Sequence, residues 1–271
     1  MQLFSSWTGS DFLLFYIMLL GLSTFAAWWM PAFLRGAGRH NESDDLESVA
    51  LLAGGRQRMT DSLLADLYVR GALVESEKGK LQVALRDLPV SPGAKALLAI
   101  DAPVTLSEAR KALSLHAERV AARLSRAGLL LRPEEHTRLR LLAVSPFVAL
   151  IVLGLYRQRA GSALDEPTGY LIALLILTAV LAVIRFVTCD ARTQAGMAAV
   201  RQLRARNARV ARAPRPHEAA MAVALFGTGV LVGTPWEPVH ALRQQGSDGG
   251  GADGSSDGGS GCGGGCGGCG G

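Results

Sequence analysis

The chain has 271 residues, of which 49% are hydrophobic and only 19% are charged, and its formal net charge is +5. Soluble domains contain roughly 25% charged residues, and the mean hydropathy here is +0.24, so the composition argues against an ordinary soluble protein. Much of the basic excess is arginine close to apolar runs, which is typical of membrane-topology charge. A nucleic-acid-binding protein would need a basic patch on a folded surface, and we therefore do not expect nucleic acid as a partner.

The first apolar run covers residues 12–34 and contains no charged residue between Asp11 and Arg35. A helix crosses the hydrocarbon core with about 20 apolar residues, so we predict a transmembrane helix here. A cleaved signal peptide is the alternative, but residues 1–11 lack the Lys or Arg of a positive n-region. Because Arg35 and Arg39 follow the run, the positive-inside rule predicts that residues 1–11 lie outside the cytoplasm.

Two further apolar runs, at 141–156 and 170–187, predict a transmembrane hairpin around the polar loop 157–169. The run at 141–156 is short, and snorkelling arginines with local thinning of the bilayer would accommodate it. Arginines are frequent after the hairpin, so the loop is expected outside and the flanking segments in the cytoplasm. Arg185 lies near the end of the last run, where we expect it to snorkel to the interface or to face a partner helix.

Residues 35–140 form the expected cytoplasmic region. Helical periodicity ends at Gly54-Gly55 and resumes with Thr60 as a plausible N-cap, and two short strands then flank a turn at 77–80. Helix, helix and hairpin is the order of a winged-helix module. A looser second copy follows, with a helix over 92–100, a long amphipathic helix that ends at Gly128, and a short strand at 129–131.

The charge of this region argues against DNA binding, because its basic and acidic residues nearly cancel and DNA binding draws on phosphate neutralisation. A structural or protein-interaction role is the favoured hypothesis. We expect His116 and His136 to be surface or capped residues and not ligands.

Residues 188–245 form an arginine-rich, helix-compatible cytoplasmic segment, and its part 191–212 could lie on anionic lipid. The apolar stretch 219–233 is short for a membrane span. We favour a core or interfacial helix there. The alternative is a fourth crossing, which would move the residues after it to the outside.

Residues 246–271 are rich in glycine and are expected to be disordered, because they contain no apolar residues with which to form a core. Cys262, Cys266 and Cys269 are spaced as C-x3-C-x2-C, and three thiolates could chelate Zn or Cu(I). Radical-SAM enzymes use this spacing for an iron–sulfur cluster, but here it lies in a glycine-rich segment. Modification to azole rings, lipidation or oxidation is a further alternative, and an unmodified tail without a cofactor is the favoured one.

The whole pattern resembles an uncharacterised family of bacterial membrane proteins, named for a conserved membrane domain that adjoins a near-uncomplex C-terminal region. The resemblance implies a bacterial inner-membrane location and a similar architecture, and it implies no catalytic residues. It is carried by the first apolar run, the hairpin, the tail and the segments 49–73, 107–131, 190–207 and 222–227.

The sequence thus predicts a mainly α polytopic membrane protein with three transmembrane helices, a cytoplasmic winged-helix-like α(+β) region and a disordered tail. We expect a non-enzymatic interaction or scaffold protein whose partners are the bilayer and a protein bound by the cytoplasmic region. The alternative is a metal-binding or thiol-redox protein, or a substrate of a modifying enzyme, acting through the tail. An enzyme would require a fold that brings His116, His136 and an acidic residue together.

Overall fold

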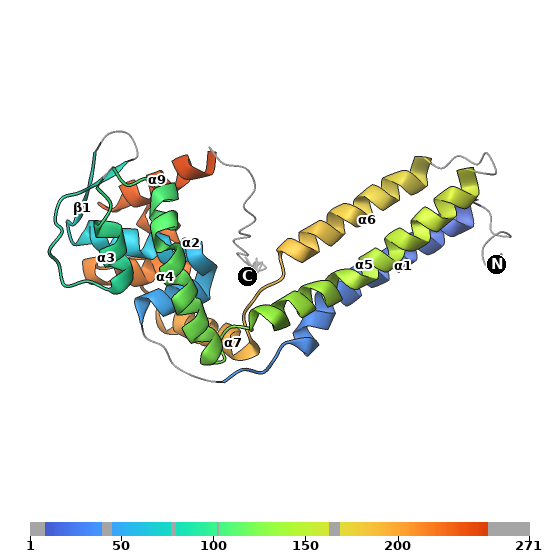
Figure 1. Ribbon diagram of the computed structural model, residues 1–271, viewed down its shortest axis with the longest axis horizontal. Helices are drawn as coiled ribbons and strands as arrows, with labels where there is room; N and C mark the ends of the chain where they lie inside the picture. Colours follow the sequence, from blue (N-terminus) through green and yellow to red (C-terminus); the bar gives the residue numbers. More distant parts are fainter. Residues whose placement is uncertain (1–8, 40–44, 77–79, 102, 163–168, 249–271) are drawn as a thin grey trace, which may run out of the picture.

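The computed structural model describes residues 9–39, 45–76, 80–101, 103–162 and 169–248, which form a three-helix bundle and a helical domain (Figure 1). The bundle contains α1 (Gly9–Leu34), α5 (Pro133–Ser162) and α6 (Gly169–Val187). The helical domain is built from the two segments that precede and follow the α5–α6 hairpin. The chain therefore leaves the helical domain at the start of α5 and returns to it after α6.

The three bundle helices are each long and apolar enough to cross a membrane, as predicted. Their candidate spans are Asp11–Met30, Pro133–Arg159 and Gly169–Val187. Helix α5 extends beyond the apolar run 141–156 at both ends, so its candidate span has 27 residues. The added residues include Glu134, Glu135 and Arg138, so the apolar part of the helix is still the run 141–156.

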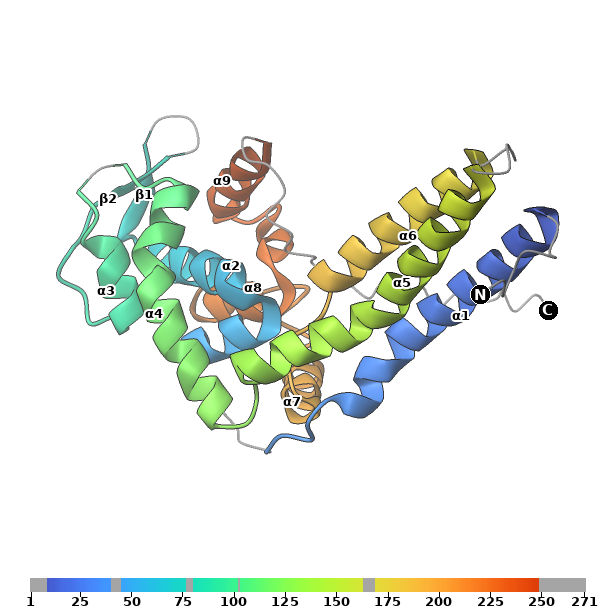
Figure 2. The ribbon, with the colours of Figure 1, turned by 45° about the vertical axis from the view of Figure 1, so that its right-hand side comes forward.

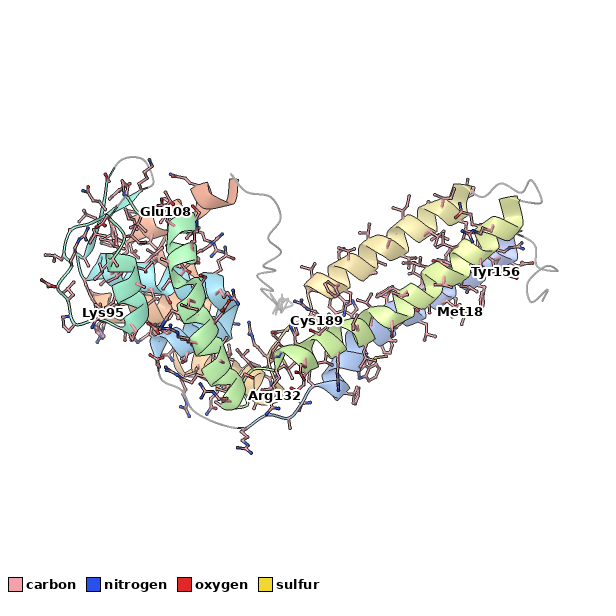
Figure 3. The ribbon with its side chains drawn as sticks, in the orientation of Figure 1. Met18, Lys95, Glu108, Arg132, Tyr156 and Cys189 are labelled. Carbon is pink, nitrogen blue, oxygen red and sulfur yellow. The ribbon has the colours of Figure 1, made fainter. Side chains whose placement is uncertain are left out.

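Most large apolar side chains of the bundle point away from it, as Figure 3 shows for Met18. Met18 is 77% exposed and Ile176 is 61% exposed. The interior is small, and Phe12, Tyr16 and Phe147 are its largest fully buried side chains. Such an outward apolar surface costs free energy in water but not in hydrocarbon.

The helical domain places its two chain segments side by side (Figure 2). Its first segment contains α2 (Leu46–Val69), β1 (Leu73–Glu75), β2 (Leu81–Val83), α3 (Pro92–Leu98) and α4 (Leu106–Arg126). Its second segment contains α7 (Gln194–Arg206), η1 (Pro216–Glu218), α8 (Ala219–Phe226), η2 (Thr228–Leu231) and α9 (Glu237–Asp248).

Helix α2 is kinked at Gly54 and Gly55, where the sequence predicted a helix end. Gly55 has φ +73°, a conformation that glycine adopts without steric cost. Thr60 is not the N-cap that we predicted, because it lies inside the second half of α2 and its hydroxyl donates to the Arg56 carbonyl at 3.1 Å. The two strands after α2 pair antiparallel, with Leu73 opposite Val83, and confirm the predicted hairpin.

The predicted helices over 92–100 and before Gly128 are present as α3 and α4. The Thr105 hydroxyl and the Glu108 carboxylate form a capping box at the start of α4, which satisfies two backbone N–H groups. Gly128 has φ +78° and follows the end of α4. The residues after it form one isolated bridge, between Leu130 and Arg192, in place of the predicted short strand.

Helix α8 lies in the core of the helical domain, packed against α2. Val223, Ala224 and Leu225 are fully buried in the same cluster as Leu63 and Leu64 of α2. This agrees with the favoured interpretation of residues 219–233 as a core helix. The arginine-rich second segment is therefore the other half of the domain that begins at residue 45.

Three chain segments pass between the bundle and the helical domain and hydrogen-bond to one another there. The backbone N–H of Gln194 donates to the Gly36 carbonyl at 3.2 Å, and that of Thr193 donates to the Leu129 carbonyl at 3.1 Å. Gly196 lies so close to the Leu129 carbonyl that a Cβ would clash with it. The junction is thus held by backbone contacts and is not a free linker.

Candidate functional site

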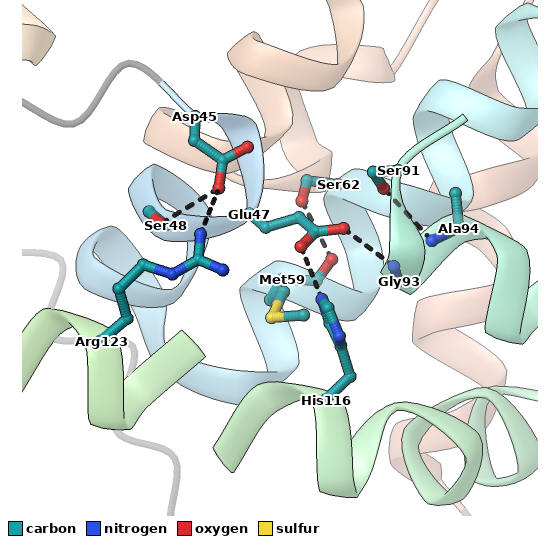
Figure 4. A network of polar contacts seen from close by, with 10 residues as sticks. All are labelled: Asp45, Glu47, Ser48, Met59, Ser62, Ser91, Gly93, Ala94, His116 and Arg123. Atoms are coloured by element: carbon teal, nitrogen blue, oxygen red, sulfur yellow. Dashed lines mark hydrogen bonds and ion pairs between the residues drawn. The ribbon is translucent and has the colours of Figure 1, made fainter. Parts of the chain in front are cut away.

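A buried polar cluster of the helical domain centres on Glu47 and His116 (Figure 4). Glu47 lies in the first turn of α2, and His116 lies on the inner face of α4. The carboxylate Oε2 and the imidazole Nε2 are 2.6 Å apart, and the two side chains are 5% and 15% exposed. The other carboxylate oxygen accepts the backbone N–H of Gly93 at the start of α3, at 3.1 Å.

These contacts decide the charge state of Glu47. Burial acts to raise its pKa, but hydrogen bonds from Ser91 and His116, the charge of His116 and the Gly93 N–H together outweigh burial and lower the pKa. The carboxylate form is thereby favoured inside the domain. Glu47 thus joins the starts of α2 and α3 to the middle of α4.

An outer layer of polar contacts surrounds this pair (Figure 4). The Ser48 hydroxyl donates to Asp45 at 3.1 Å, and Arg123 of α4 lies 3.9 Å from the same carboxylate. The first contact closes the N-terminal turn of α2, and the second ties that turn to α4. A carboxylate–imidazole pair can exchange a proton, but here both groups are engaged in holding three helices together.

His136, the second histidine singled out from the sequence, lies elsewhere. Its Nε2 is 3.1 Å from the backbone carbonyl of Cys189, at the junction with the bundle. The structure thus brings His116 to an acidic residue but does not bring His136 to that pair. His116 is not at the surface, because it is 15% exposed and its imidazole is capped by Glu47, which was the other option that we expected for it.

A second buried ion pair joins α2 to α9. Asp61 is 3% exposed and pairs with Arg243, and the Nη1 of Arg58 donates to the Val223 carbonyl nearby at 3.3 Å. Burial raises the pKa of Asp61, and the charges of Arg243, Arg58 and Arg110 partly offset this effect. The pair fastens the last described helix to the core.

The bundle has its own buried polar groups. The hydroxyls of Tyr16 and Thr178 are 3.1 Å apart and connect α1 to α6. Arg185 of α6 is 8% exposed, and its Nε donates to the Ala27 carbonyl of α1 at 2.8 Å. It therefore faces a partner helix, which was one of the two expectations for this residue.

The predicted metal ligands Cys262, Cys266 and Cys269 lie outside the described residues. Cys189, which the structure does describe, is a buried free thiol beside Leu131 and Leu139. Within the described ranges, no group of three or more His, Cys, Asp or Glu side chains could hold a metal ion.

Sequence reasoning missed Glu47, Asp61 and Arg243 as buried groups. A usable signal was present at Glu47 and Asp61, since each lies within an apolar helical pattern where a charged residue is costly unless paired. Their partners come from other elements, and the pairing could not be read from periodicity.

No family model matches this chain, and no curated protein or solved structure matches it either.

Proposed function

We propose that the chain is a non-enzymatic interaction or scaffold protein of the bacterial inner membrane, which it crosses with α1, α5 and α6. The helical domain would lie in the cytoplasm and bind a protein partner. The observation that carries the proposal is the joint core of residues 45–131 and 194–248, attached to three helices of membrane length.

The shared core supports a hairpin topology for α5 and α6. Val223 of the second segment packs with Leu63 of the first, so both segments must lie on one side of the membrane. A chain can satisfy this condition only by crossing an even number of times between them. The arginines that follow α1 and α6 favour the cytoplasmic side, with residues 1–11 and the α5–α6 connection outside.

The polar groups of the helical domain support a binding role over catalysis. Glu47 and Asp61, its two most buried carboxylates, pair with His116 and Arg243 across helices. The kinked α2 followed by β1 and β2 has the helix, helix and hairpin order of a winged-helix module, and we propose that this part contacts the partner. Its mixed charge favours a protein over nucleic acid.

Reporter fusions test the topology. We expect a cytoplasmic reporter such as green fluorescent protein to be active when fused after residue 79 or after residue 248, and a periplasmic phosphatase reporter to be active only at residues 163–168. Phosphatase activity after residue 248 would overturn the proposal, because the two halves of one core would then lie on opposite sides.

A photo-crosslinking amino acid in the full-length protein tests the partner. Leu85 follows β2 and is 52% exposed, Leu115 on α4 is 60% exposed, and Met18 on α1 provides a lipid-facing control at 77%. We expect a discrete protein adduct from Leu85 or Leu115 that Met18 does not give. If the folded protein gave only lipid adducts, or no adduct at all, an interaction role would be contradicted.

The alternative function is metal or thiol chemistry in the tail, for which the spacing of Cys262, Cys266 and Cys269 is the support. We expect one Zn or Cu(I) per chain by titration if this alternative holds. Replacing all three residues by Ser should remove that binding, while Cys189→Ser serves as the control that retains it. An absence of stoichiometric binding in the wild-type protein would exclude the alternative.

A further inference from the structure

One arginine from each bundle segment lies at the end of the bundle that adjoins the helical domain. Arg35 directly follows α1, Arg140 lies in the second turn of α5, and Arg185 lies in the last turn of α6. In Figure 3 this end is the one near the labelled residues Arg132 and Cys189. The three side chains are more buried than Arg39, Arg132 and Arg138 of the same region, and Arg192, which is also partly buried there, differs from them by its ion pair with Asp190.

Arg185 is the most buried of the three. Its Nε is bound to the Ala27 carbonyl, and its guanidinium lies 5.8 Å from the centre of the Trp28 ring. Two titratable groups act on it electrostatically: the Cys189 thiol favours its positive charge, and Arg35 repels it. Two positive charges thus lie near each other at a place where Arg185 has little access to water.

Arg35 and Arg140 each keep a buried Nε–H without a hydrogen-bond acceptor in the described part of the chain. The Nη1 of Arg35 contacts the Met197 sulfur at 2.9 Å, and the guanidinium of Arg140 lies 5.2 Å from the centre of the Phe186 ring. A thioether is a weak acceptor, and an aromatic face accepts no strong hydrogen bond. Each side chain therefore keeps a buried donor that the described residues leave unsatisfied, and an anion could satisfy it only if the side chain turned toward it.

Topology alone does not account for this arrangement. Arg39, Arg132 and Arg138 are also near this end of the bundle, and all three are exposed to solvent. Exposed arginines satisfy the positive-inside rule at no desolvation cost. Burial of like charges with free donors is costly unless an acceptor fills the site.

We propose that Arg35, Arg140 and Arg185 bind the phosphate group of an anionic phospholipid in the leaflet next to the helical domain. The inference rests on the proposed function, because it requires α1, α5 and α6 to cross the bilayer. Guanidinium groups bind phosphate oxygens in pairs of parallel hydrogen bonds. A lipid headgroup is favoured over free phosphate because Arg185 and Trp28 lie within candidate spans, and Trp28 is 69% exposed at the depth of an interfacial aromatic.

The test is native mass spectrometry of the full-length protein in detergent, titrated with phosphatidylglycerol or with phosphatidylcholine of the same acyl chains. We expect the wild-type protein to bind one phosphatidylglycerol at least about tenfold more tightly than phosphatidylcholine. The double variant Arg35→Gln and Arg140→Gln should lose this preference. Equal affinity for the two lipids in the wild-type protein would overturn the inference.

Matched controls separate the site from net charge. The pair Arg39→Gln and Arg138→Gln removes the same charge from exposed positions and should keep the preference. Because Arg185→Gln could disturb the bundle through Ala27, Arg185→Lys is compared as well, together with the melting temperature of each variant. If the double variant at Arg39 and Arg138 also lost the preference for phosphatidylglycerol, the total positive charge and not a defined site would explain lipid binding, and the inference would be contradicted.

Inorganic phosphate and glycerophosphoglycerol, which carries the headgroup without acyl chains, distinguish the source of the phosphate. We expect neither to displace the bound lipid at millimolar concentration. Displacement by inorganic phosphate would overturn the lipid assignment. The reporter fusions test the proposed function separately from this inference. If the helical domain is cytoplasmic but the protein shows no lipid preference, only this inference is rejected. If a phosphatase fused after the helical domain is active, the proposed function itself is rejected.

Discussion

The bundle and the helical domain distribute apolar side chains in opposite ways. In the helical domain, Leu63, Leu64 and Val223 are buried together and charged side chains cover the outside. In the bundle, Ile176 and Met18 face outward, while Tyr16, Thr178 and Arg185 are buried between helices. The helical domain thus has the apolar distribution expected in water, and the bundle has the one expected in hydrocarbon.

The sharpest test of this comparison replaces two equally exposed residues. Ile176 in the middle of α6 is 61% exposed, and Leu115 on α4 is 60% exposed. Ile176→Asp should impair insertion of α6 by about 3 to 4 kcal/mol, whereas Leu115→Asp should change stability by about 0.5 kcal/mol or less.

Membrane fractionation and the melting temperature of the purified protein measure these effects. Similar effects of both substitutions would mean that the bundle and the helical domain share one environment, and the comparison would then fail.

The next largest effect concerns the ion pair between Asp61 and Arg243. Arg243→Ala leaves a buried carboxylate without its partner and should destabilise the helical domain by about 3 kcal/mol. The double variant with Asp61→Asn should recover part of this loss, because it removes the uncompensated charge. Chemical unfolding of the detergent-solubilised protein, followed by the fluorescence of Trp236 in the helical domain, provides the measurement. A double variant as unstable as Arg243→Ala would contradict the assigned role of the pair.

Protonation of Glu47 at low pH is expected to lower the stability of the helical domain by a smaller amount. Its pKa is lowered in the folded protein, so its contribution to stability is complete above the ordinary pKa of a glutamate and is lost as the pH falls through the lowered value. Glu47→Gln should cost about 1 to 2 kcal/mol at neutral pH and should flatten the acid dependence of the melting temperature. An unchanged acid dependence in this variant would assign the effect to other carboxylates. Asp101→Asn, at an exposed pair with Arg86, is the matched control.

The smallest effect belongs to the bundle. Tyr16→Phe removes the hydroxyl contact with Thr178 and should destabilise the bundle by about 0.6 kcal/mol. The loss is small because Thr178 also donates to the Leu174 carbonyl of its own helix at 2.7 Å. A thermal shift of the reconstituted protein would detect it, and Tyr170→Phe on the exposed side of α6 should give none. A loss above about 2 kcal/mol would show that the hydroxyl pair organises the bundle.

Most of the correct predictions from the sequence rested on the length of the apolar runs and on turn residues such as glycine. The spans, the break at Gly54-Gly55, the hairpin of β1 and β2 and the end of α4 before Gly128 all follow from local patterns. Thr60 was misassigned because a threonine can donate to a carbonyl four residues earlier within a helix.

Long-range pairing was beyond such reasoning. The core position of α8 was favoured from its shortness, but its packing against α2 depends on contacts between residues more than 150 positions apart, such as the one from Arg58 to Val223. The partners of Glu47 and Asp61 are set in the same way. The three arginines at the end of the bundle were each visible in the sequence, yet their burial required the fold.

The split of the helical domain around α5 and α6 has a consequence for biosynthesis. When the ribosome has made α2, α3 and α4, these helices still lack α8, and their apolar faces remain uncovered until both hairpin helices have been synthesised. In the proposed topology, a chain that inserted only one of the two hairpin helices would deliver α8 to the wrong side, and the apolar faces of its first half would stay exposed. Completion of the helical domain would therefore depend on insertion of both hairpin helices.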